Sequence, residues 1–311
     1  MLYTGPNQSA QYSGLGVEGV VVDAAGGAPF NTIGQAIAYF AAHNAAGRRV
    51  IYVMPGAYAE SFTVPAAPFS IIGLGQVEIT GTVTLTDDAD EYLLENLQIT
   101  SAAAGTCIDA DMGGLAATGT VRLRNIRLVT SAVGGGLLAA ACNVFIEGGL
   151  RVSCPASTGI SLTSGDVAAE RTRFVADRVH LLGAAVVDGI ITADGAGGDL
   201  TVEVRIAHLL SEISASGNLI DWNTTGAHAA GVYNGFDLGW LELRPAAADG
   251  DGVSAFIEYI DTGADADPEH HIGTISGRIN NALIVNHNGG RLIIDTLDLP
   301  DDGTGRDTFQ I

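Results

Sequence analysis

The sequence predicts an all-β protein, a single right-handed parallel β-helix whose N-terminal end is closed by one capping α-helix. A strand pattern at residues 94–101 returns at 123–131, an offset of 29 residues. Glycine is abundant, with 42 residues, whereas aromatic residues make up only 6%, which suits stacked aliphatic rows joined by tight turns. Only one segment has a clear helical period. Repeated strand units of this length are typical of β-solenoids, in which each coil buries its apolar face against its neighbours.

The chain is expected to begin with an arm. Residues 1–19 are polar, rich in Gly, Ser and Gln, and show no period. Residues 20–75 are expected to hold the capping helix and the first coil, with a first strand at 20–23. The sequence from Ala24 to Pro29 then breaks that strand.

One amphipathic helix is predicted over residues 32–44. Thr32 and Gln35 have the spacing of a capping box. Apolar residues then recur on one face of a 3.6-residue period, from Ile33 to Ala41. An open β-helix ends in a ring of unpaired strand edges, so we expect this helix to cover the first apolar coil.

Residues 76–299 are expected to form the remaining coils. The echoes of the strand pattern recur at roughly 24 to 32 residues, and 245–291 fits the pattern poorly. Asn96 and Asn125 occupy matching positions in two repeats, which predicts a stacked Asn ladder at a turn. Residues 300–311 form an acidic tail that is expected to cover the other end or to bind a neighbouring chain.

The charge balance narrows the classes of partner. There are 14 basic residues, all arginine, against 35 acidic residues, which gives a net charge of −21. This balance argues against nucleic acid and anionic membrane as partners, because both require basic patches. A basic protein surface or a divalent cation remains open. The absence of lysine is explained either by a GC-rich genome or by a saline habitat.

No targeting or redox feature stands out in the sequence. The first residues have neither the basic start nor the apolar stretch of a secretory signal, so the mature chain is expected to begin at Met1. Cys107, Cys142 and Cys154 lack metal-ligand spacing. They are expected to be small buried hydrophobic residues.

Three short segments near the N-terminus resemble a known family. Residues 30–37 (FNTIGQAI), 49–60 (RVIYVMPGAYAE) and 71–75 (IIGLG) are similar to the opening of pectin-lyase-like β-helix proteins, and most similar to the start of the pectinesterases. The resemblance covers about 45 residues, a seventh of the chain. It implies a right-handed parallel β-helix, a fold that phage tailspikes and fibres also have.

The catalytic motifs of that family are not matched. Pectinesterase-like catalysis implies a Gln-Asp motif, yet Ile294 stands before Asp295, and no Gln occurs between Gln98 and Gln310. Polygalacturonase-like chemistry implies a Lys, which the chain lacks, and no pectate-lyase-like cluster of calcium-binding Asp with a basic residue is visible. We therefore expect no catalytic residues, no bound organic cofactor and no enzymatic activity.

A calcium site is the strongest metal candidate in the sequence. Alternating carboxylates are typical of a loop that wraps a hard cation, and they recur at Asp261, Asp265, Asp267 and Glu269. The adjoining His270-His271 pair is a candidate for a transition metal. The alternative is a solvated acidic loop without a metal, and we therefore expect no cofactor other than calcium.

Other residues are weaker candidates. The acidic stretch 87–91 and the Asp109/Asp111 pair are candidate cation sites or solvated turns, as is a further Asp pair at 249 and 251. Trp222 and Trp240 are candidates for sugar stacking, with a core or interface role as the alternative.

These observations favour a non-enzymatic structural protein of a virus (phage) particle. It would be a capsid decoration or cement protein, or a spike or fibre component, at the virion surface and bound to capsid or tail proteins. A homo-oligomer is expected, with a trimer as the commonest arrangement among β-helix spikes. The alternative is an extracellular polysaccharide-binding or polysaccharide-degrading β-helix protein with a glycan ligand, such as a tailspike depolymerase. A surface protein of a halophilic cell is a third reading.

Overall fold

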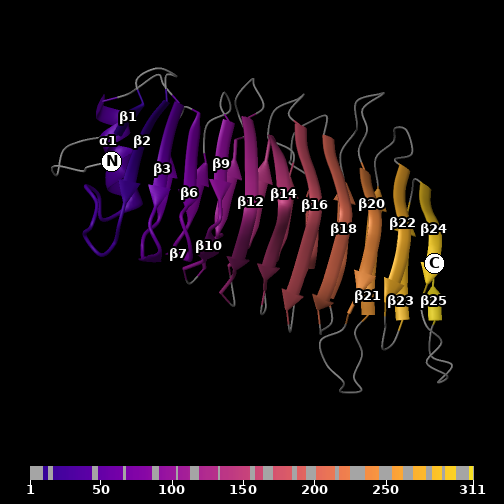
Figure 1. The fold of residues 1–311 in the computed structure, drawn as a ribbon. Coiled ribbons are helices and arrows are strands. Elements are labelled where there is room, and N and C mark those ends of the chain that lie inside the picture. Colours follow the sequence, from indigo (N-terminus) through magenta and orange to yellow (C-terminus); the bar gives the residue numbers. More distant parts are fainter. Residues whose placement is uncertain are drawn as a thin grey trace.

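The protein is an elongated stack of β-strand coils, with its N- and C-terminal ends at opposite ends of the stack (Figure 1). The computed structural model describes residues 10–12, 17–43, 48–65, 68–85, 91–102, 104–112, 119–131, 134–154, 158–163, 171–183, 188–193, 201–213, 217–224, 235–244, 254–261, 269–277, 282–288, 291–298 and 308–310. In these residues the strands are arranged in two large sheets, and one helix, α1 (Ile33–His43), lies at the N-terminal end.

Sheet A is the larger of the two sheets. Its strands are β1 (Ala10–Tyr12), β2 (Val17–Val22), β3 (Arg48–Val53), β4 (Gly56–Tyr58), β6 (Phe69–Gly73), β7 (Val77–Thr80), β9 (Glu91–Glu95), β10 (Gln98–Thr100), β12 (Gly119–Val129), β14 (Cys142–Ser153), β16 (Arg171–Gly183), β18 (Thr201–Ile213), β20 (Gly235–Leu243), β22 (Glu269–Gly277) and β24 (Arg291–Asp298).

Sheet B holds shorter strands that alternate along the chain with those of sheet A. They are β5 (Phe62–Val64), β8 (Val83–Leu85), β11 (Ile108–Asp111), β13 (Leu137–Ala140), β15 (Ile160–Thr163), β17 (Asp188–Ala193), β19 (Gly217–Thr224), β21 (Ser254–Asp261), β23 (Ala282–Asn288) and β25 (Thr308–Gln310). Each pairs with the sheet B strands of the preceding and following coils.

The pairing is parallel throughout, except for the antiparallel pair β1–β2. Long parallel sheets whose strands alternate along the chain are consistent with a β-helix or solenoid, and the predicted all-β class is confirmed. Leu94 pairs with Leu123, so the 29-residue offset seen in the sequence is one coil. Paired residues are separated by as few as 20 residues (Arg49–Phe69) and as many as 37 (Ile220–Ile257), a wider range than predicted.

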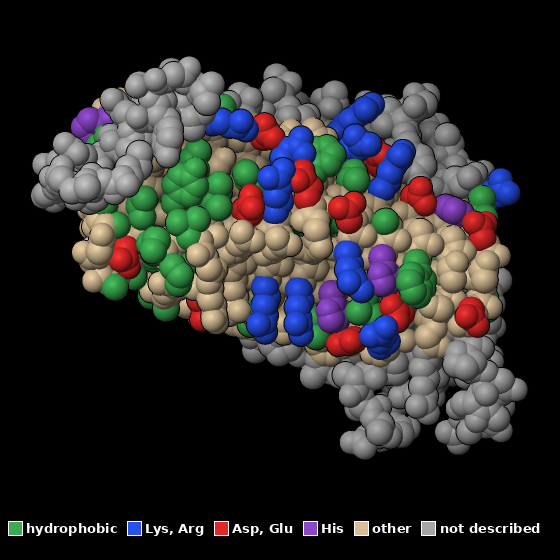
Figure 2. Space-filling model, in the orientation of Figure 1, with side chains coloured by type: hydrophobic (Ala, Val, Ile, Leu, Met, Phe, Trp, Pro, Cys, Tyr) green, Lys and Arg blue, Asp and Glu red, His purple; other side chains and the backbone are tan. Residues whose placement is uncertain are grey.

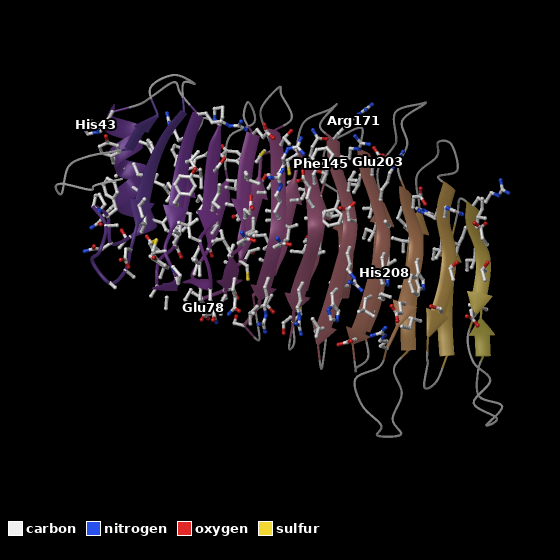
Figure 3. All side chains as sticks on the ribbon, viewed as in Figure 1. His43, Glu78, Phe145, Arg171, Glu203 and His208 are labelled. Atoms are coloured by element: carbon white, nitrogen blue, oxygen red, sulfur yellow. The ribbon has the colours of Figure 1, made fainter. Side chains whose placement is uncertain are left out.

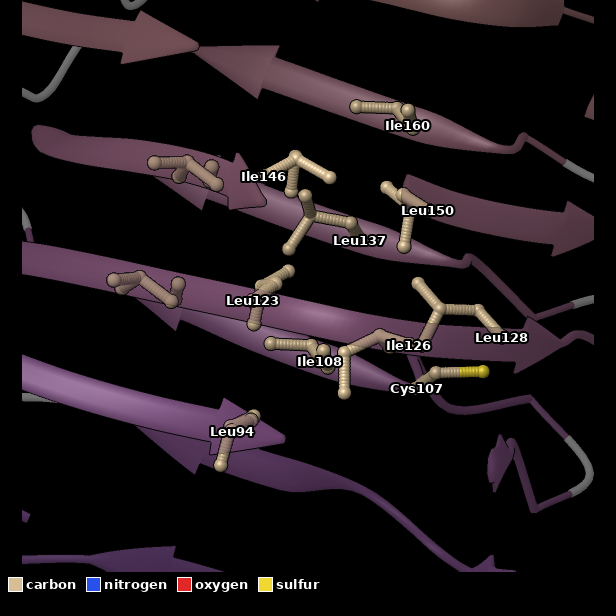
Figure 4. Packing of buried hydrophobic residues seen from close by; sticks show 14 of the residues in the cluster. Leu94, Cys107, Ile108, Leu123, Ile126, Leu128, Leu137, Ile146, Leu150 and Ile160 are labelled. Atoms are coloured by element: carbon tan, nitrogen blue, oxygen red, sulfur yellow. The ribbon is translucent and has the colours of Figure 1, made fainter. Parts of the chain in front are cut away.

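The interior is filled by rows of aliphatic side chains that cross the sheets from coil to coil. Inward positions alternate with outward ones along each strand, as the two-residue period of a strand requires. Figure 4 shows the side chains of both sheets meeting in this interior. One row of paired residues in sheet A runs Ile51, Ile71, Leu94, Leu123, Ile146, Ala176, Ile206, Leu238, Ile272 and Ile294.

The long strands of sheet A bend at a corner that is set by a left-handed residue. Asn96 and Asn125 have φ angles of 56° and 52°, a conformation that Asn tolerates better than most residues. The Asn125 side-chain amide donates a hydrogen bond to Oδ1 of Asn96 at 3.1 Å. The predicted Asn ladder is therefore confirmed. Because the corner shifts the alternation by one residue, Leu123 before it and Ile126 after it both face the interior.

The three cysteines lie in this interior. Cys107, Cys142 and Cys154 are buried and carry free thiols. Burial raises the pKa of the Cys107 thiol to about 11 and that of Cys142 and Cys154 to about 12. The prediction that they are small buried hydrophobic residues is confirmed.

Helix α1 packs one face against the first coils. Ile33, Ala36, Ile37 and Phe40 are buried and belong to the same core cluster as the strands. The Thr32 hydroxyl accepts a hydrogen bond from the Gln35 backbone N–H at 3.1 Å, as the capping-box spacing predicts. Gln35 Oε1 reaches back to the Asn31 backbone N–H at 3.0 Å, one residue before the cap.

A carboxylate from the first coil also holds the helix. The two oxygens of Glu60 accept hydrogen bonds from the backbone N–H groups of Ile33 and Gly34 at 2.7 and 2.9 Å. These groups have no partner within the helix, and a negative charge is favoured at a helix N-terminus. Nearby, the Tyr58 hydroxyl donates to the Met54 carbonyl at 2.9 Å. The Tyr58-x-Glu60 part of the resemblance motif therefore has a structural role here.

Two regions differ from the expected strand pattern. The first coil strand, β2, begins at Val17 instead of residue 20, and β1 pairs beside it. The region 245–291, whose sequence fits the repeat poorly, contains β21, β22 and β23, which pair with the strands of adjacent coils. Among the described residues, no helix has both the length and the apolar character needed to cross a membrane.

Candidate functional site: the outer face of sheet A

The outer face of sheet A carries most of the charged side chains seen in Figure 2. The corner divides this face into a first panel, formed by the strand segments before the corner, and a second panel, formed by the segments after it. On β18, Glu203 belongs to the first panel and His208 to the second, and both are labelled in Figure 3.

Arginine and glutamate side chains tie the N-terminal coils of the first panel together. Arg122 contacts Glu91 on one neighbouring coil at 2.5 Å and Glu147 on the other at 2.8 Å. Arg124 contacts Glu147 at 2.5 Å and Glu95 at 3.6 Å. Hydrogen bonds from Arg124 and then Arg122 lower the pKa of Glu147. Each pair is partly exposed and weak by itself, but the network links three successive coils.

Histidine replaces arginine as the partner of carboxylates in the C-terminal coils. His180 Nε2 lies 3.3 Å from Glu212, and His208 Nε2 lies 3.0 Å from Glu242. These two pairs are on the second panel and join β16 to β18 and β18 to β20.

His271 on the first panel is held by two carboxylates at once. Its Nδ1 lies 3.1 Å from Asp237 on β20, and its Nε2 lies 2.9 Å from Asp295 on β24. Hydrogen bonding to Asp237, and then to Asp295, raises the pKa of His271. With both ring nitrogens engaged, the imidazole acts as a clamp between three coils and offers no free lone pair to a metal or a substrate proton.

The His271 clamp is expected to make the last coil more stable at acidic than at alkaline pH. Because folding raises the pKa of His271, its stabilising contribution is complete below pH 6.5 and is lost as the pH rises through the folded-state pKa. Burial lowers the pKa of His180, which gives the opposite trend, so the contribution of His271 must be measured by difference.

The measurement is amide hydrogen exchange of β24 in the wild type and in His271→Gln at pH 5.5 and pH 8. Protection of β24 relative to the variant is expected to be several-fold greater at pH 5.5. An equal ratio at both pH values would show that the clamp does not stabilise the coil.

The second panel carries a row of basic side chains. Arg127 on β12 pairs in register with Arg151 on β14, which pairs with His180 on β16. Arg178 lies on the same face of β16, and Trp240 lies further along on β20. Blue and purple side chains follow one another across the lower part of Figure 2, where the second panel faces the viewer.

The four calcium candidates are only partly described by the structure. Asp261 ends β21 in sheet B and Glu269 begins β22 in sheet A, whereas Asp265 and Asp267 lie outside the described residues. Over the described ranges, no group of three or more His, Cys, Asp or Glu side chains is arranged to hold a metal ion. The calcium site at these four residues stays a prediction.

The expectation that His270 and His271 form a pair of ligands is wrong. The two residues are neighbours on a strand, so their side chains point to opposite faces of sheet A. His270 is fully buried, and its ring stacks on Phe236 with centroids 4.4 Å apart. His271 lies on the outer surface in its clamp.

The weaker carboxylate candidates are dispersed. Residues 87–90 and the Asp pair at 249 and 251 lie outside the described residues, and Glu91 belongs to the arginine network of the first panel. Asp109 and Asp111 lie on the outer side of β11 in sheet B. Burial, and then the nearby charge of Asp111, raise the pKa of Asp109.

The two tryptophans differ in what the structure describes. Trp222 lies in β19, where only the backbone is described. Trp240 is 42% exposed, its ring stacks on the His208 imidazole with centroids 4.4 Å apart, and its Nε1–H donates to the Ser276 hydroxyl at 2.6 Å. Of the two sugar-stacking candidates, Trp240 therefore presents aromatic surface to solvent.

The first and second panels thus consist of charges that bridge coils, together with one basic and aromatic row. Comparisons with protein-family models, with curated proteins and with solved structures found no match to this chain. The site must therefore be interpreted from its own chemistry.

Proposed function

We propose that this protein is a non-enzymatic structural component of a virus particle, a capsid decoration protein or a spike or fibre component that attaches end-on to capsid or tail proteins. The observation that carries the proposal is the difference between the two ends of the stack. Helix α1 packs on the first coils, whereas apolar side chains of the last sheet A coil reach solvent.

The last coil exposes positions that are buried in the coil before it. Ile275 on β22 is fully buried, and its partner on β24, Leu297, is 44% exposed. Ile272 is likewise fully buried, and its partner Ile294 is only partly buried. Exposed apolar side chains on a rigid body favour a protein interface, and the capsid or tail protein of the particle is the occupant we propose.

The finer form of the fold supports the same function. We propose a right-handed, single-stranded parallel β-helix of the pectin-lyase-like type with α1 as its N-terminal cap. The buried face of α1 and the placement of Glu60 at its N-terminus support the capping role. A solenoid of this kind resists bending because its coils share one core, which suits a projection or clamp on a particle surface. An oligomer, such as a trimer, would place several of these rods together.

The test is incorporation into particles. Intact particles would be purified on a density gradient from a host that carries the gene, and from a deletion strain complemented with wild type, Leu297→Glu or Leu74→Glu. Leu74 is also exposed, at 51%, but lies near the opposite end of the stack. Peptides of the wild type and of Leu74→Glu are expected in the particle fraction, with Leu297→Glu reduced at least ten-fold.

Absence of the wild-type chain from purified particles would overturn the structural assignment. Equal incorporation of the two leucine variants would overturn end-on attachment through the last coil. Circular dichroism of each purified variant confirms that it has folded, because both leucines are exposed.

A further inference from the structure

The second panel of sheet A combines three features that no part of the proposed function uses. The first is a pair of arginines in register on adjacent coils. Arg127 and Arg151 are exposed and directly paired across β12 and β14, so their backbones are about 4.8 Å apart. Two guanidinium groups at this distance present parallel forks of N–H donors, which match the oxygens of a carboxylate or sulfate group.

The second feature is that this positive charge is uncompensated. Within the described residues, Arg127, Arg151 and Arg178 have no carboxylate within 4.0 Å, whereas Arg122, Arg124 and Arg205 of the first panel do. Burial is the main cause of the lowered pKa of His180, and the charges of Arg151 and Arg178 lower it further. In a chain of net charge −21, this local concentration of positive charge is unusual.

The third feature is an aromatic surface on the same panel. His208 supports one side of the Trp240 ring, and Ser276 fixes its orientation by accepting its N–H. The residue in register on the next coil is Thr274, which is much smaller than an indole and leaves the ring accessible. Holding Trp240 in place in advance lowers the entropic cost of stacking a ligand on it.

The spacing places these features on one line. From Arg151 to Trp240 the line crosses three strand spacings, from β14 through β16 and β18 to β20, or about 14 Å. Arg127 extends it by one further spacing. This span is the length of a short oligosaccharide laid across the strands, along the direction in which the coils stack.

We propose that the second panel binds an anionic polysaccharide, with its acidic groups at Arg127, Arg151 and Arg178 and a sugar ring stacked on Trp240. Carboxylated and sulfated chains share the chemistry that this row recognises. The proposal does not depend on attachment to a particle, since the row lies on the side of the stack and the attachment surface lies at its end.

A glycan fits this row better than a nucleic acid does. Nucleic acid carries one charge per nucleotide and its binding depends on many phosphate contacts, while the rest of this protein is strongly acidic. Single-stranded nucleic acid is held by repeated aromatic platforms, and the described part of the panel offers one. A sugar chain with widely spaced acidic groups needs only a few arginines and one aromatic ring.

The test is isothermal titration calorimetry with short oligosaccharides of defined length. The probes are a carboxylated alginate oligomer, a sulfated heparin fragment, a neutral dextran oligomer and oligo-dT. The Arg127→Gln/Arg151→Gln double variant keeps two polar side chains and removes both charges. Arg205→Gln, an exposed arginine of the first panel, is the matched control. Trp240→Ala and Trp240→Phe test the ring.

Wild type is expected to bind at least one anionic oligosaccharide and not dextran, and the preferred anionic probe identifies the acidic group. The double variant is expected to raise Kd at least ten-fold and Trp240→Ala about five-fold. Trp240→Phe should retain most of the affinity, and Arg205→Gln all of it. No binding of either anionic oligosaccharide, equal affinity of Arg205→Gln and the double variant, or tighter binding of oligo-dT would overturn the proposal.

Discussion

Replacing Phe40 with alanine is expected to lower the free energy of unfolding of the N-terminal coils by about 3–5 kcal/mol. Phe40 is fully buried on the inner face of α1. Its ring meets that of Phe69 on β6 edge to face, with centroids 5.7 Å apart and planes at 88°. Alanine would leave a cavity between the helix and the first coils and would remove this aromatic contact.

Chemical denaturation combined with amide exchange of β2, β3 and β6 measures the effect. The two methods are needed together because coils of a solenoid can unfold locally as well as globally. Leu74→Ala, at an exposed leucine, is the control and should change stability by less than about 0.5 kcal/mol. A loss below about 1 kcal/mol for Phe40→Ala would mean that α1 contributes little to the stability of the coils it covers.

Replacing Gly136 with alanine is expected to destabilise the middle of the stack by about 2–4 kcal/mol. A Cβ atom at this position would lie 2.2 Å from the Gly159 carbonyl oxygen on the next coil and 2.8 Å from a Val152 methyl group. The same carbonyl accepts the Leu137 N–H at 3.0 Å. The coils would have to separate, which weakens this hydrogen bond and the packing beneath it.

The adjacent residue provides a closely matched control. A Cβ atom at Gly135 would lie 3.4 Å from its nearest neighbour, Thr106, which is an ordinary contact. Gly135→Ala is therefore expected to change stability by less than about 1 kcal/mol. Thermal unfolding of both variants tests the difference. Similar losses for the two would show that the separation of the coils is not limited by backbone contact at Gly136.

Features that repeat in the sequence could be predicted well. Leu94 and Leu123 were recognised as equivalent because their neighbours also match, and they pair directly in the structure. Asn96 and Asn125 stand at the same corner because Asn is one of the few residues that adopts a positive φ readily. The helix could be placed because its apolar period differs from that of the strands.

The second sheet and the binding row could not be predicted. Strands such as β5 and β8 have only three residues, too few for an alternating pattern to be distinguished from chance. Arg127 and Arg151 meet only because the pairing register brings them together, and with coils of unequal length that register cannot be read from the sequence. The contact of Glu60 with the helix joins segments 26 and 27 residues apart and has no local signal.

The unequal length of the coils has a consequence for how such a protein can change. The chain between paired residues varies from 20 to 37 residues, yet the ladders of both sheets continue without interruption. Insertions between strands are therefore absorbed outside the cross-section, which the strands alone determine. A tag or a foreign epitope can be added at such a junction, and whole coils can be gained or lost, without redesign of the interior.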